Sequence, residues 1–249
     1  MTAGALPAGY VRVTAGRCAV VVLEALADDA RALLDEGSLY EAAARDLGAH
    51  PLQGRGAVYS IALPRSGRRA VVRRNRHGGV FGALTRDLFL PPTRAPYELA
   101  MSLRLRAAHV RTPAVLMYGV ERMHGVLRHA DVVTAEVSDG RDLATYMQPG
   151  EDAVQRADAW RATVALVQAL GAAGARHHDL NVKNILLAPA VQGLAAWVLD
   201  VDRVTFGDPA SVHRANVARL LRSARKWRGE RGAELEEGVF GPLAQKSGD

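Results

Sequence analysis

The chain has 249 residues, of which 49% are apolar and 23% are charged, so it can bury the core of one large domain or of two closely joined lobes. Aromatic residues make up only 5%, which disfavours a nucleic-acid surface built from stacked rings, and we expect no nucleic-acid partner. The net charge of +6 comes from 29 arginines and three lysines against 26 acidic residues. A biased composition explains part of this excess, but arginine also suits phosphate and carboxylate partners.

Cysteine usage and the N-terminus indicate the compartment. Cys18 is the single cysteine, which excludes an intrachain disulfide and a metal site built from cysteines and favours a reducing environment. Residues 1–10 lack the basic start and the apolar stretch of a signal peptide, and no apolar run is long enough to span a bilayer. We therefore expect a cytoplasmic protein that is at most peripheral on a membrane.

The N-terminal half of the sequence is strand-rich. Residues 1–50 are expected to form an extension packed on a small lobe, and Ser38 followed by Glu41 fits a capping box at the start of a helix. Beyond this extension, a strand, turn, strand pattern around 64–67 predicts an antiparallel hairpin. The expected elements up to Asp139 are, in chain order, a strand over 18–23, helices around 28–34 and 39–47, strands over 57–63 and 69–73, a helix over 93–108, and strands around 119–123, 126–127 and 132–137.

The C-terminal half has a helical pattern. Apolar residues at helical spacing predict a long helix over 152–173, ended by Gly171 and Gly174, and a second helix over 211–227. The Gly- and Glu-rich tail from about residue 229 is expected to be flexible. The change from a strand-rich to a helical pattern predicts three parts, namely the extension over 1–50, an N-lobe over 51–139 and a C-lobe over 140–249.

The strongest chemical signal lies between these two helices. Asp179 and Asn184 are five positions apart and precede the apolar triplet 185–187. This is the spacing of a phosphotransferase catalytic loop, in which the aspartate takes or orients the proton of the acceptor hydroxyl, the asparagine binds a metal ion, and the following strand anchors both. An Asp and an Asn are each common in loops, so the spacing before a strand carries the prediction.

The neighbouring residues of this loop have more than one interpretation. Lys183 either neutralises charge on the transferred phosphoryl group or is an ordinary solvated loop lysine. The adjacent residues His177 and His178 are poorly placed to chelate one ion, so we interpret His177 as a hydrogen-bonding residue that braces the loop.

A second polar cluster, Asp200-Val201-Asp202-Arg203, follows an apolar strand. A carboxylate that leaves a buried strand is costly unless it meets a cation. Asp200 is therefore a candidate Mg²⁺ ligand together with Asn184, and Arg203 is a candidate partner for Asp202. The alternative is a salt-bridged strand end.

Two features of the N-terminal half fit a nucleotide. Gly54 and Gly56 precede a strand, where glycines let backbone N–H groups approach phosphates; Tyr59 takes the place of a third glycine, and an ordinary hairpin turn is the alternative. Arg73 at the end of the next strand is a candidate for binding ATP phosphates, and Glu98 on the following helix is a candidate for fixing that arginine. The alternative is that both side chains are simply solvated.

Together these motifs resemble the bacterial lipopolysaccharide-core sugar kinases, and most closely the 3-deoxy-D-manno-octulosonic acid (Kdo) kinases. The resemblance extends from residue 54 to about residue 228. The segments that carry it are Gly54-Arg55-Gly56, 72–79, Thr93-Arg94-Ala95 with Glu98, 132–137, 178–187, Asp200-x-Asp202-Arg203, and 219–226. Many kinase-like families share the catalytic loop, whereas the last two segments are more specific.

The resemblance implies an α+β, protein-kinase-like bilobal fold with an antiparallel β-sheet N-lobe and a mainly helical C-lobe. It implies the use of ATP and Mg²⁺, with ATP held between the lobes near Glu136 and Val137. It also implies transfer of the γ-phosphate to the 4-hydroxyl of Kdo in a lipid A precursor. An arginine at position 73, where protein kinases have a lysine, is similar to this family.

The acceptor implied by the resemblance is a lipid-linked acidic sugar, which places the protein on the cytoplasmic face of the inner membrane. The basic segment 73–77 and the helix residues Arg222, Arg225 and Lys226 are candidates for contact with this acceptor or with the membrane surface.

Three positions depart from the family pattern and bear on the identity of the acceptor, namely His77, Pro96 and Val201. The alternatives are a heptose kinase of the lipopolysaccharide core, a kinase that acts on a protein or a small molecule, and a pseudokinase that binds a nucleotide without turnover. The presence of Asp179, Asn184 and Asp200 disfavours the pseudokinase.

Overall fold

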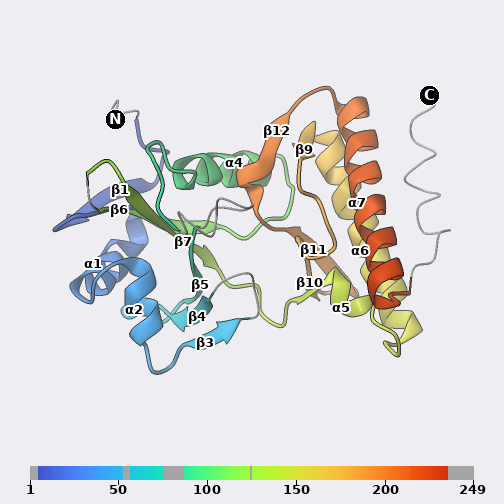
Figure 1. Cartoon of the computed structure of the whole chain (residues 1–249), viewed down its shortest axis with the longest axis horizontal. Helices are drawn as coiled ribbons and strands as arrows, with labels where there is room; N and C mark the ends of the chain where they lie inside the picture. Colours follow the sequence, from blue (N-terminus) through green and yellow to red (C-terminus); the bar gives the residue numbers. More distant parts are fainter. Residues whose placement is uncertain (1–4, 53–56, 76–86, 124, 235–249) are drawn as a thin grey trace. The chain divides into compact units, whose positions relative to one another are not determined.

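The computed structural model describes residues 5–52, 57–75, 87–123 and 125–234 (Figure 1). The chain divides into two compact units. The first comprises Met1–Ala100 and Ala114–Glu136, and the second comprises Met101–Pro113 and Val137–Asp249. Gly54, Gly56 and His77 lie outside the described residues, so the structure gives no account of them.

The first unit is built around an antiparallel sheet. Among the described residues the sheet has seven strands in the order β1-β2-β6-β7-β5-β4-β3. The strands are β1 (Tyr10–Ala15), β2 (Cys18–Leu23), β3 (His50–Leu52), β4 (Val58–Ala62), β5 (Arg69–Arg74), β6 (Val115–Arg122) and β7 (Arg128–Ala135). The expected hairpin is confirmed, because β4 pairs with β5 around the predicted turn. β1 and β2 are strands of the same sheet, so the first fifty residues contribute to the sheet as well as to its helical cover.

The helices of the first unit lie on both faces of this sheet (Figure 1). They are α1 (Ala27–Asp35), α2 (Leu39–Arg45) and the start of α4 (Ala95–Ala107), preceded by the short 3₁₀ helix η1 (Glu24–Leu26). The predicted capping box is present: Ser38 Oγ accepts from the Glu41 N–H at 3.2 Å, and Glu41 accepts from the Ser38 N–H at 3.2 Å. Leu33, Leu34 and Leu39 pack with strand residues such as Val20, Ile61 and Leu116 in one core.

Two expectations in this unit need correction. The helix predicted over 93–108 begins at Ala95, and Pro96 occupies its first turn, where a missing N–H costs nothing. The three short strands expected between 119 and 137 are two longer strands, β6 and β7. Val126 belongs to the turn between them and is 61% exposed, so its apolar character was misleading.

The second unit combines helices with short strands. Its helices are α5 (Leu143–Tyr146), α6 (Ala153–Ala172) and α7 (Pro209–Arg231), with the 3₁₀ helix η2 (Val201–Arg203). In the described ranges its strands form a sheet β11-β10-β8 and a pair β12-β9. Their bounds are β8 (Arg141–Asp142), β9 (Ala175–His177), β10 (Ile185–Pro189), β11 (Leu194–Val198) and β12 (Val204–Phe206). α6 and α7 lie side by side, and Trp160, Leu170 and Leu220 are in their shared core (Figure 1).

Both predicted helices of this unit are confirmed with different ends. Gly171 lies within α6 rather than after it. A glycine fits this position because His213 of α7 packs so closely that a Cβ would be 2.7 Å from its Nδ1. The left-handed Gly174 follows the end of the helix, with φ of 62°. α7 continues to Arg231 and is capped by the left-handed Gly232, so Gly229 is helical and the helix reaches past the expected start of the tail.

None of the helices in the described ranges combines the length and the apolar composition that a membrane crossing requires.

Candidate functional site

The loop between β9 and β10 holds Asp179 and Asn184 together. The amide groups of Asn184 and Asn181 both donate to the Asp179 carbonyl oxygen at 2.9 Å. The Asn181 side-chain oxygen accepts from the N–H of Lys183 at 2.9 Å and from that of Asn184 at 3.2 Å. Such side-chain bonds to nearby backbone replace a regular turn. The loop over these residues therefore folds back on itself and brings the two predicted functional residues together.

His177 braces this loop, as expected from the sequence. Its side chain is buried, with the residue only 1% exposed. One ring nitrogen, Nδ1, accepts from the N–H of Asp179 at 3.2 Å, and the other, Nε2, lies 2.9 Å from the carbonyl oxygen of Leu199. An imidazole that accepts at Nδ1 must carry its proton on Nε2, so this arrangement selects one neutral tautomer. Burial lowers the pKa of His177, which agrees with that neutral form.

Asp200 lies beside Asn184 because the backbone connects their segments. The N–H of Leu199 donates to the carbonyl oxygen of Asn184 at 2.9 Å, immediately before Asp200. Asp200 has a left-handed backbone, with φ of 53° and ψ of 49°, which turns the chain into η2. Among L-residues, aspartate and asparagine accept this conformation most readily.

The physical reason given for Asp200 from the sequence was wrong in one respect. The carboxylate was expected to leave a buried strand, but Asp200 is exposed and β11 has already ended at Val198. No desolvation cost therefore forces a cation onto it. Its candidacy rests instead on its position next to Asn184.

The donor set at this place fits a magnesium ion. The Asn184 Nδ2 is used by Asp179, which leaves the amide oxygen as the group for a cation, and Asp200 adds a carboxylate. Hard oxygen donors of this kind suit Mg²⁺, which takes its remaining ligands from phosphates and water. In the described part of the chain, no group of three His, Cys, Asp or Glu residues is arranged to hold a metal.

One face of α7 runs along the whole loop. Asn216 bonds the N–H of His177 at 3.0 Å and the carbonyl oxygen of Ala175 at 2.9 Å. One turn on, Arg219 contacts Asp179 Oδ1 through Nη2 at 2.6 Å. Ser223 accepts from the N–H of Val182 at 3.2 Å. A further turn on, Trp227 lies beneath the Lys183 ammonium, 5.2 Å from the ring centroid.

Sequence reasoning missed these contacts of α7. A signal was present, because Asn216 and Ser223 are polar positions on the side of α7 that also carries the buried Leu220. Buried polar side chains in a helix generally have a partner to satisfy.

The Lys183 side chain is 51% exposed, as expected for a loop lysine, but it is also held by two contacts. Its Nζ lies 2.8 Å from Asp142 Oδ2, and it stacks on Trp227. Asp142 also caps α5 by accepting from the N–H of Thr145 at 2.9 Å. The ammonium is thus an element of the loop's scaffold.

In the first unit, the predicted ion pair between Arg73 and Glu98 is present. Arg73 Nη2 contacts Glu98 Oε1, and Nη1 donates to Asn75 Oδ1 at 3.0 Å. The Glu98 side chain is only 4% exposed, whereas that of Arg73 is 26% exposed. The carboxylate is therefore a buried anchor, and the guanidinium reaches the surface from it.

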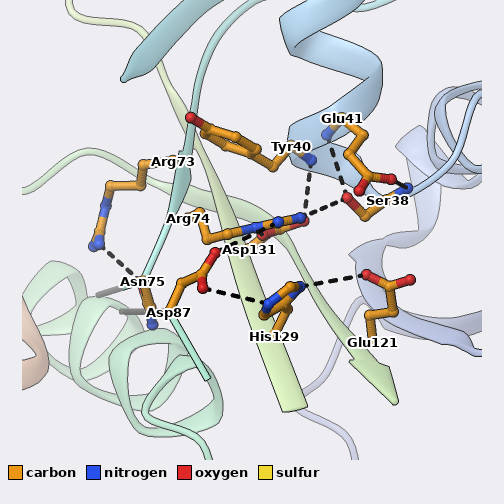
Figure 2. A network of polar contacts seen from close by, with 10 residues as sticks. All are labelled: Ser38, Tyr40, Glu41, Arg73, Arg74, Asn75, Asp87, Glu121, His129 and Asp131. Atoms are coloured by element: carbon orange, nitrogen blue, oxygen red, sulfur yellow. Dashed lines mark hydrogen bonds and ion pairs between the residues drawn. The ribbon is translucent and has the colours of Figure 1, made fainter. Parts of the chain in front are cut away.

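The next residue, Arg74, points to the opposite face of the sheet and enters a different network (Figure 2). It donates from Nε to Asp131 Oδ1 at 2.9 Å and from Nη2 to Ser38 Oγ at 2.8 Å. Asp131 also accepts from the N–H of Tyr40 at 3.0 Å, and the guanidinium lies over the Tyr40 ring. This network attaches the start of α2 to β5 and β7, which is a structural role.

The network extends to the ends of the central strands β6 and β7. His129 lies between Asp87 at 3.4 Å and Glu121 at 3.7 Å (Figure 2).

Burial, with Asp131 and Glu121 nearby, raises the pKa of Cys18 to about 12. The single thiol is therefore protonated and unreactive at neutral pH.

Glu136 and Val137 lie where the chain passes from the first unit to the second. The Glu136 carboxylate accepts from Ser60 Oγ at 2.8 Å and pairs with Arg69 Nε at 2.9 Å. The Val137 carbonyl oxygen accepts from the N–H of Gly140 at 3.3 Å. The side chain of Glu136 is thus bound to the sheet through Oε2.

Comparisons with known proteins show the family of the chain. Residues 49–238 match the model of the Lipopolysaccharide kinase (Kdo/WaaP) family. The chain is 30% identical to a 3-deoxy-D-manno-octulosonic acid kinase from Actinobacillus succinogenes, over 75% of this chain and 78% of that protein. It is 32% identical to a 3-deoxy-D-manno-octulosonic acid kinase from Xylella fastidiosa, over 75% of this chain and 74% of that protein.

Among solved structures, the fold is similar to that of WaaP in complex with acyl carrier protein. The TM-score is 0.56, and the match covers 92% of this chain and 88% of that chain. At 18% identity, the similarity concerns the fold alone. Together with the antiparallel sheet and the helices described above, it confirms the kinase-like α+β fold expected from the sequence.

Proposed function

Because this chain belongs to the lipopolysaccharide kinase (Kdo/WaaP) family, we propose that it uses ATP to phosphorylate the 4-hydroxyl of a Kdo residue in a lipid A precursor. Membership of the family makes the chain a phosphotransferase that acts on a sugar hydroxyl. The observation that carries the choice of Kdo is the name shared by the curated relatives, which match about three quarters of the chain.

Asp179 is the proposed catalytic residue. Its carboxylate is 43% exposed and its backbone is fixed on both sides, by His177 and by the amides of Asn181 and Asn184. A carboxylate so placed can accept the proton of the acceptor hydroxyl, or orient it, as the hydroxyl attacks the γ-phosphorus. Positioning of this kind supplies most of the catalysis in phosphoryl transfer.

Asn184 and Asp200 are the proposed ligands of Mg²⁺. Their support is the hydrogen bond between the Leu199 N–H and the Asn184 carbonyl, which holds the backbone just before Asp200 against Asn184. When bound, Mg²⁺ neutralises negative charge on the phosphates of ATP.

Arg73, braced by Glu98, is the proposed phosphate-binding cation. The buried carboxylate fixes one side of the guanidinium, and the exposed part of the side chain can contact phosphate oxygens. We further assign Gly54 and Gly56 to backbone contacts with the nucleotide, and Glu136 and Val137 to contacts made by their main chain.

The proposed acceptor is attached to a lipid, which makes the cytoplasmic face of the inner membrane the proposed place of action. Arg222, Arg225 and Lys226 are exposed on α7, and basic side chains of this kind gain from anionic head groups. We therefore include a peripheral contact with the membrane surface in the proposal.

A direct assay tests the proposed function. The purified full chain is incubated with labelled ATP, Mg²⁺ and one of two acceptors, a Kdo-bearing lipid A precursor or a heptosylated core acceptor. We expect transfer to the Kdo acceptor, and mass spectrometry of the product should place the phosphate on the Kdo 4-hydroxyl. Transfer only to heptose would overturn the assignment of the acceptor. Mg²⁺-dependent ATP binding without transfer to either acceptor would identify a pseudokinase.

A further inference from the structure

Arg219 is the cation next to the proposed catalytic carboxylate. Its Nη2 lies 2.6 Å from Asp179 Oδ1, and its Nε donates to the His178 carbonyl oxygen at 3.4 Å. These contacts use two of the five N–H donors of the guanidinium. The Arg219 side chain is 34% exposed, so solvent and ligands can reach it.

The position of Arg219 is fixed by its neighbours on α7. Asn216 and Ser223, on either side of it in the sequence, are both buried and both bond to the backbone of the loop. Leu220, next to Arg219, is fully buried in the core. The backbone of Arg219 therefore cannot move away from Asp179 without breaking buried hydrogen bonds.

Lys183, the cation of the loop itself, is already paired with other groups. Lys183 pairs with Asp142 at 2.8 Å and lies against Trp227. The pair with Asp142 also connects it to the start of α5, because Asp142 caps that helix. Arg219 is thus better placed than Lys183 to meet an anionic group that arrives with the acceptor hydroxyl.

The chemistry of the acceptor supplies such a group. This step rests on the proposed function, in which the acceptor is an acidic sugar whose ring carries a carboxylate as well as the reacting hydroxyl. A guanidinium binds a carboxylate through two parallel hydrogen bonds, which fixes orientation as well as charge. We propose that Arg219 recognises the carboxylate of the acceptor sugar while Asp179 receives its hydroxyl, and that Arg219 is therefore a specificity-determining residue.

The alternative is that Arg219 only positions Asp179. The two roles differ in one measurable respect. A positioning residue affects every acceptor by the same factor, whereas a residue that binds the carboxylate matters only when the carboxylate is present. The ratio of rates on charged and neutralised acceptors therefore separates the roles.

The experiment compares a Kdo-bearing lipid A precursor with the methyl ester of its Kdo carboxylate. Values of kcat/KM are measured for the wild-type chain, for Arg219→Gln and Arg219→Lys, and for Arg214→Gln as the matched control. Arg214 is exposed near the start of the same helix, where its charge acts on the N-cap residue Asp208. Thermal unfolding of each variant checks its fold.

We expect the wild-type chain to prefer the free acid over the ester by roughly 10- to 100-fold, the range for a hydrogen bond to a charged group. In Arg219→Gln this preference should fall to about 1- to 2-fold, in Arg219→Lys it should be intermediate, and in Arg214→Gln it should equal that of the wild type. If Arg219→Gln does not fold, the ratio for Arg219→Lys decides in its place.

An unchanged preference in a folded Arg219 variant would overturn the inference and leave the proposed function intact. Absence of transfer from the wild-type chain to either Kdo acceptor would overturn the proposed function, and this inference with it.

Discussion

The imidazole of His177 reaches the carbonyl oxygen of Leu199 at 2.9 Å, across 22 residues of sequence. The same ring accepts the N–H of Asp179 at 3.2 Å. One neutral side chain therefore connects the loop that carries the proposed catalytic aspartate to the residue that precedes the proposed metal ligand Asp200. Since protonation of Nδ1 would remove its ability to accept, this connection depends on pH.

The first prediction concerns stability against pH. Burial is the largest effect on His177 and lowers its pKa, against the opposing effects of the Leu199 hydrogen bond and of Asp200, Asp179 and Asp202. The unfolded state has the ordinary pKa of about 6.5 and binds a proton before the folded state does. The contribution of His177 is thus fully present above about pH 6.5 and is lost as pH falls, by at most about 1.4 kcal/mol per pH unit.

Urea unfolding of the wild type and of His177→Gln, at intervals from pH 8 to pH 5.5, measures this effect. Gln can keep one donor and one acceptor but does not titrate. We expect it to be less stable at pH 8 and to have a flatter pH dependence. Parallel curves for the two proteins would show that His177 does not carry the effect.

The second prediction concerns Asp179. In Asp179→Asn the side chain can no longer accept a proton, and kcat should fall roughly 10²- to 10⁴-fold, the usual range for general acid–base catalysis. Binding of ATP should be unchanged, because the loop is held by backbone contacts of Asp179 that Asn retains. Full turnover by Asp179→Asn on the Kdo acceptor would show that the proposed mechanism is wrong.

The residues that sequence reasoning placed correctly are those whose partners are local or whose order in the fold is fixed. Asp179 and Asn184 are near in sequence, so their spacing alone predicts that they meet. Arg73 and Glu98 are 25 positions apart, but they lie on β5 and α4, which follow one another among the described elements. Their pairing was therefore also within reach of a pattern.

The contacts of α7 could not be predicted from a sequence pattern. Its bonds to the loop join residues 39 to 41 positions apart, on elements whose packing no local pattern specifies. The exposure of Asp200 was missed for a similar reason, because β11 ends at Val198, one residue before the apolar run ends at Leu199. Gly171 was taken as a helix end, although it is there to admit His213.

The third prediction tests the proposed metal ligand with a control of matched backbone. Asp200 and Asp139 both have a left-handed conformation, with φ of 53° and 55°. Asn accepts this conformation about as well as Asp, so neither Asp200→Asn nor Asp139→Asn should alter stability by more than about 0.5 kcal/mol. Only Asp200→Asn should raise the Mg²⁺ concentration required for activity, by roughly 10-fold or more. Calorimetric titration of Mg²⁺ into the chain with a non-hydrolysable ATP analogue measures the difference.

The fourth prediction concerns the phosphate-binding cation. In Arg73→Gln a charged contact to ATP is lost, and the KM for ATP should rise roughly 10- to 100-fold. Arg73→Lys should recover part of this loss, because it keeps the charge without the fork geometry. Arg68→Gln, in the exposed turn of the same hairpin, is the control and should match the wild type. An unchanged KM in Arg73→Gln would remove Arg73 from the nucleotide site.

The fifth prediction uses the neighbouring residue, whose side chain points to the other face of the sheet. Arg74 and Asp131 form an ion pair with side chains only 8% and 4% exposed. Arg74→Met leaves the Asp131 charge buried with fewer partners, at a cost of about 3–5 kcal/mol in the free energy of unfolding. The KM for ATP of the folded fraction should nevertheless stay within about 2-fold of the wild type, because in the described part of the chain Arg74 bonds to groups of the structural network. Urea unfolding and initial rates, measured on the same preparation, give both values. A raised KM with normal stability would instead place Arg74, and not only Arg73, in the nucleotide site.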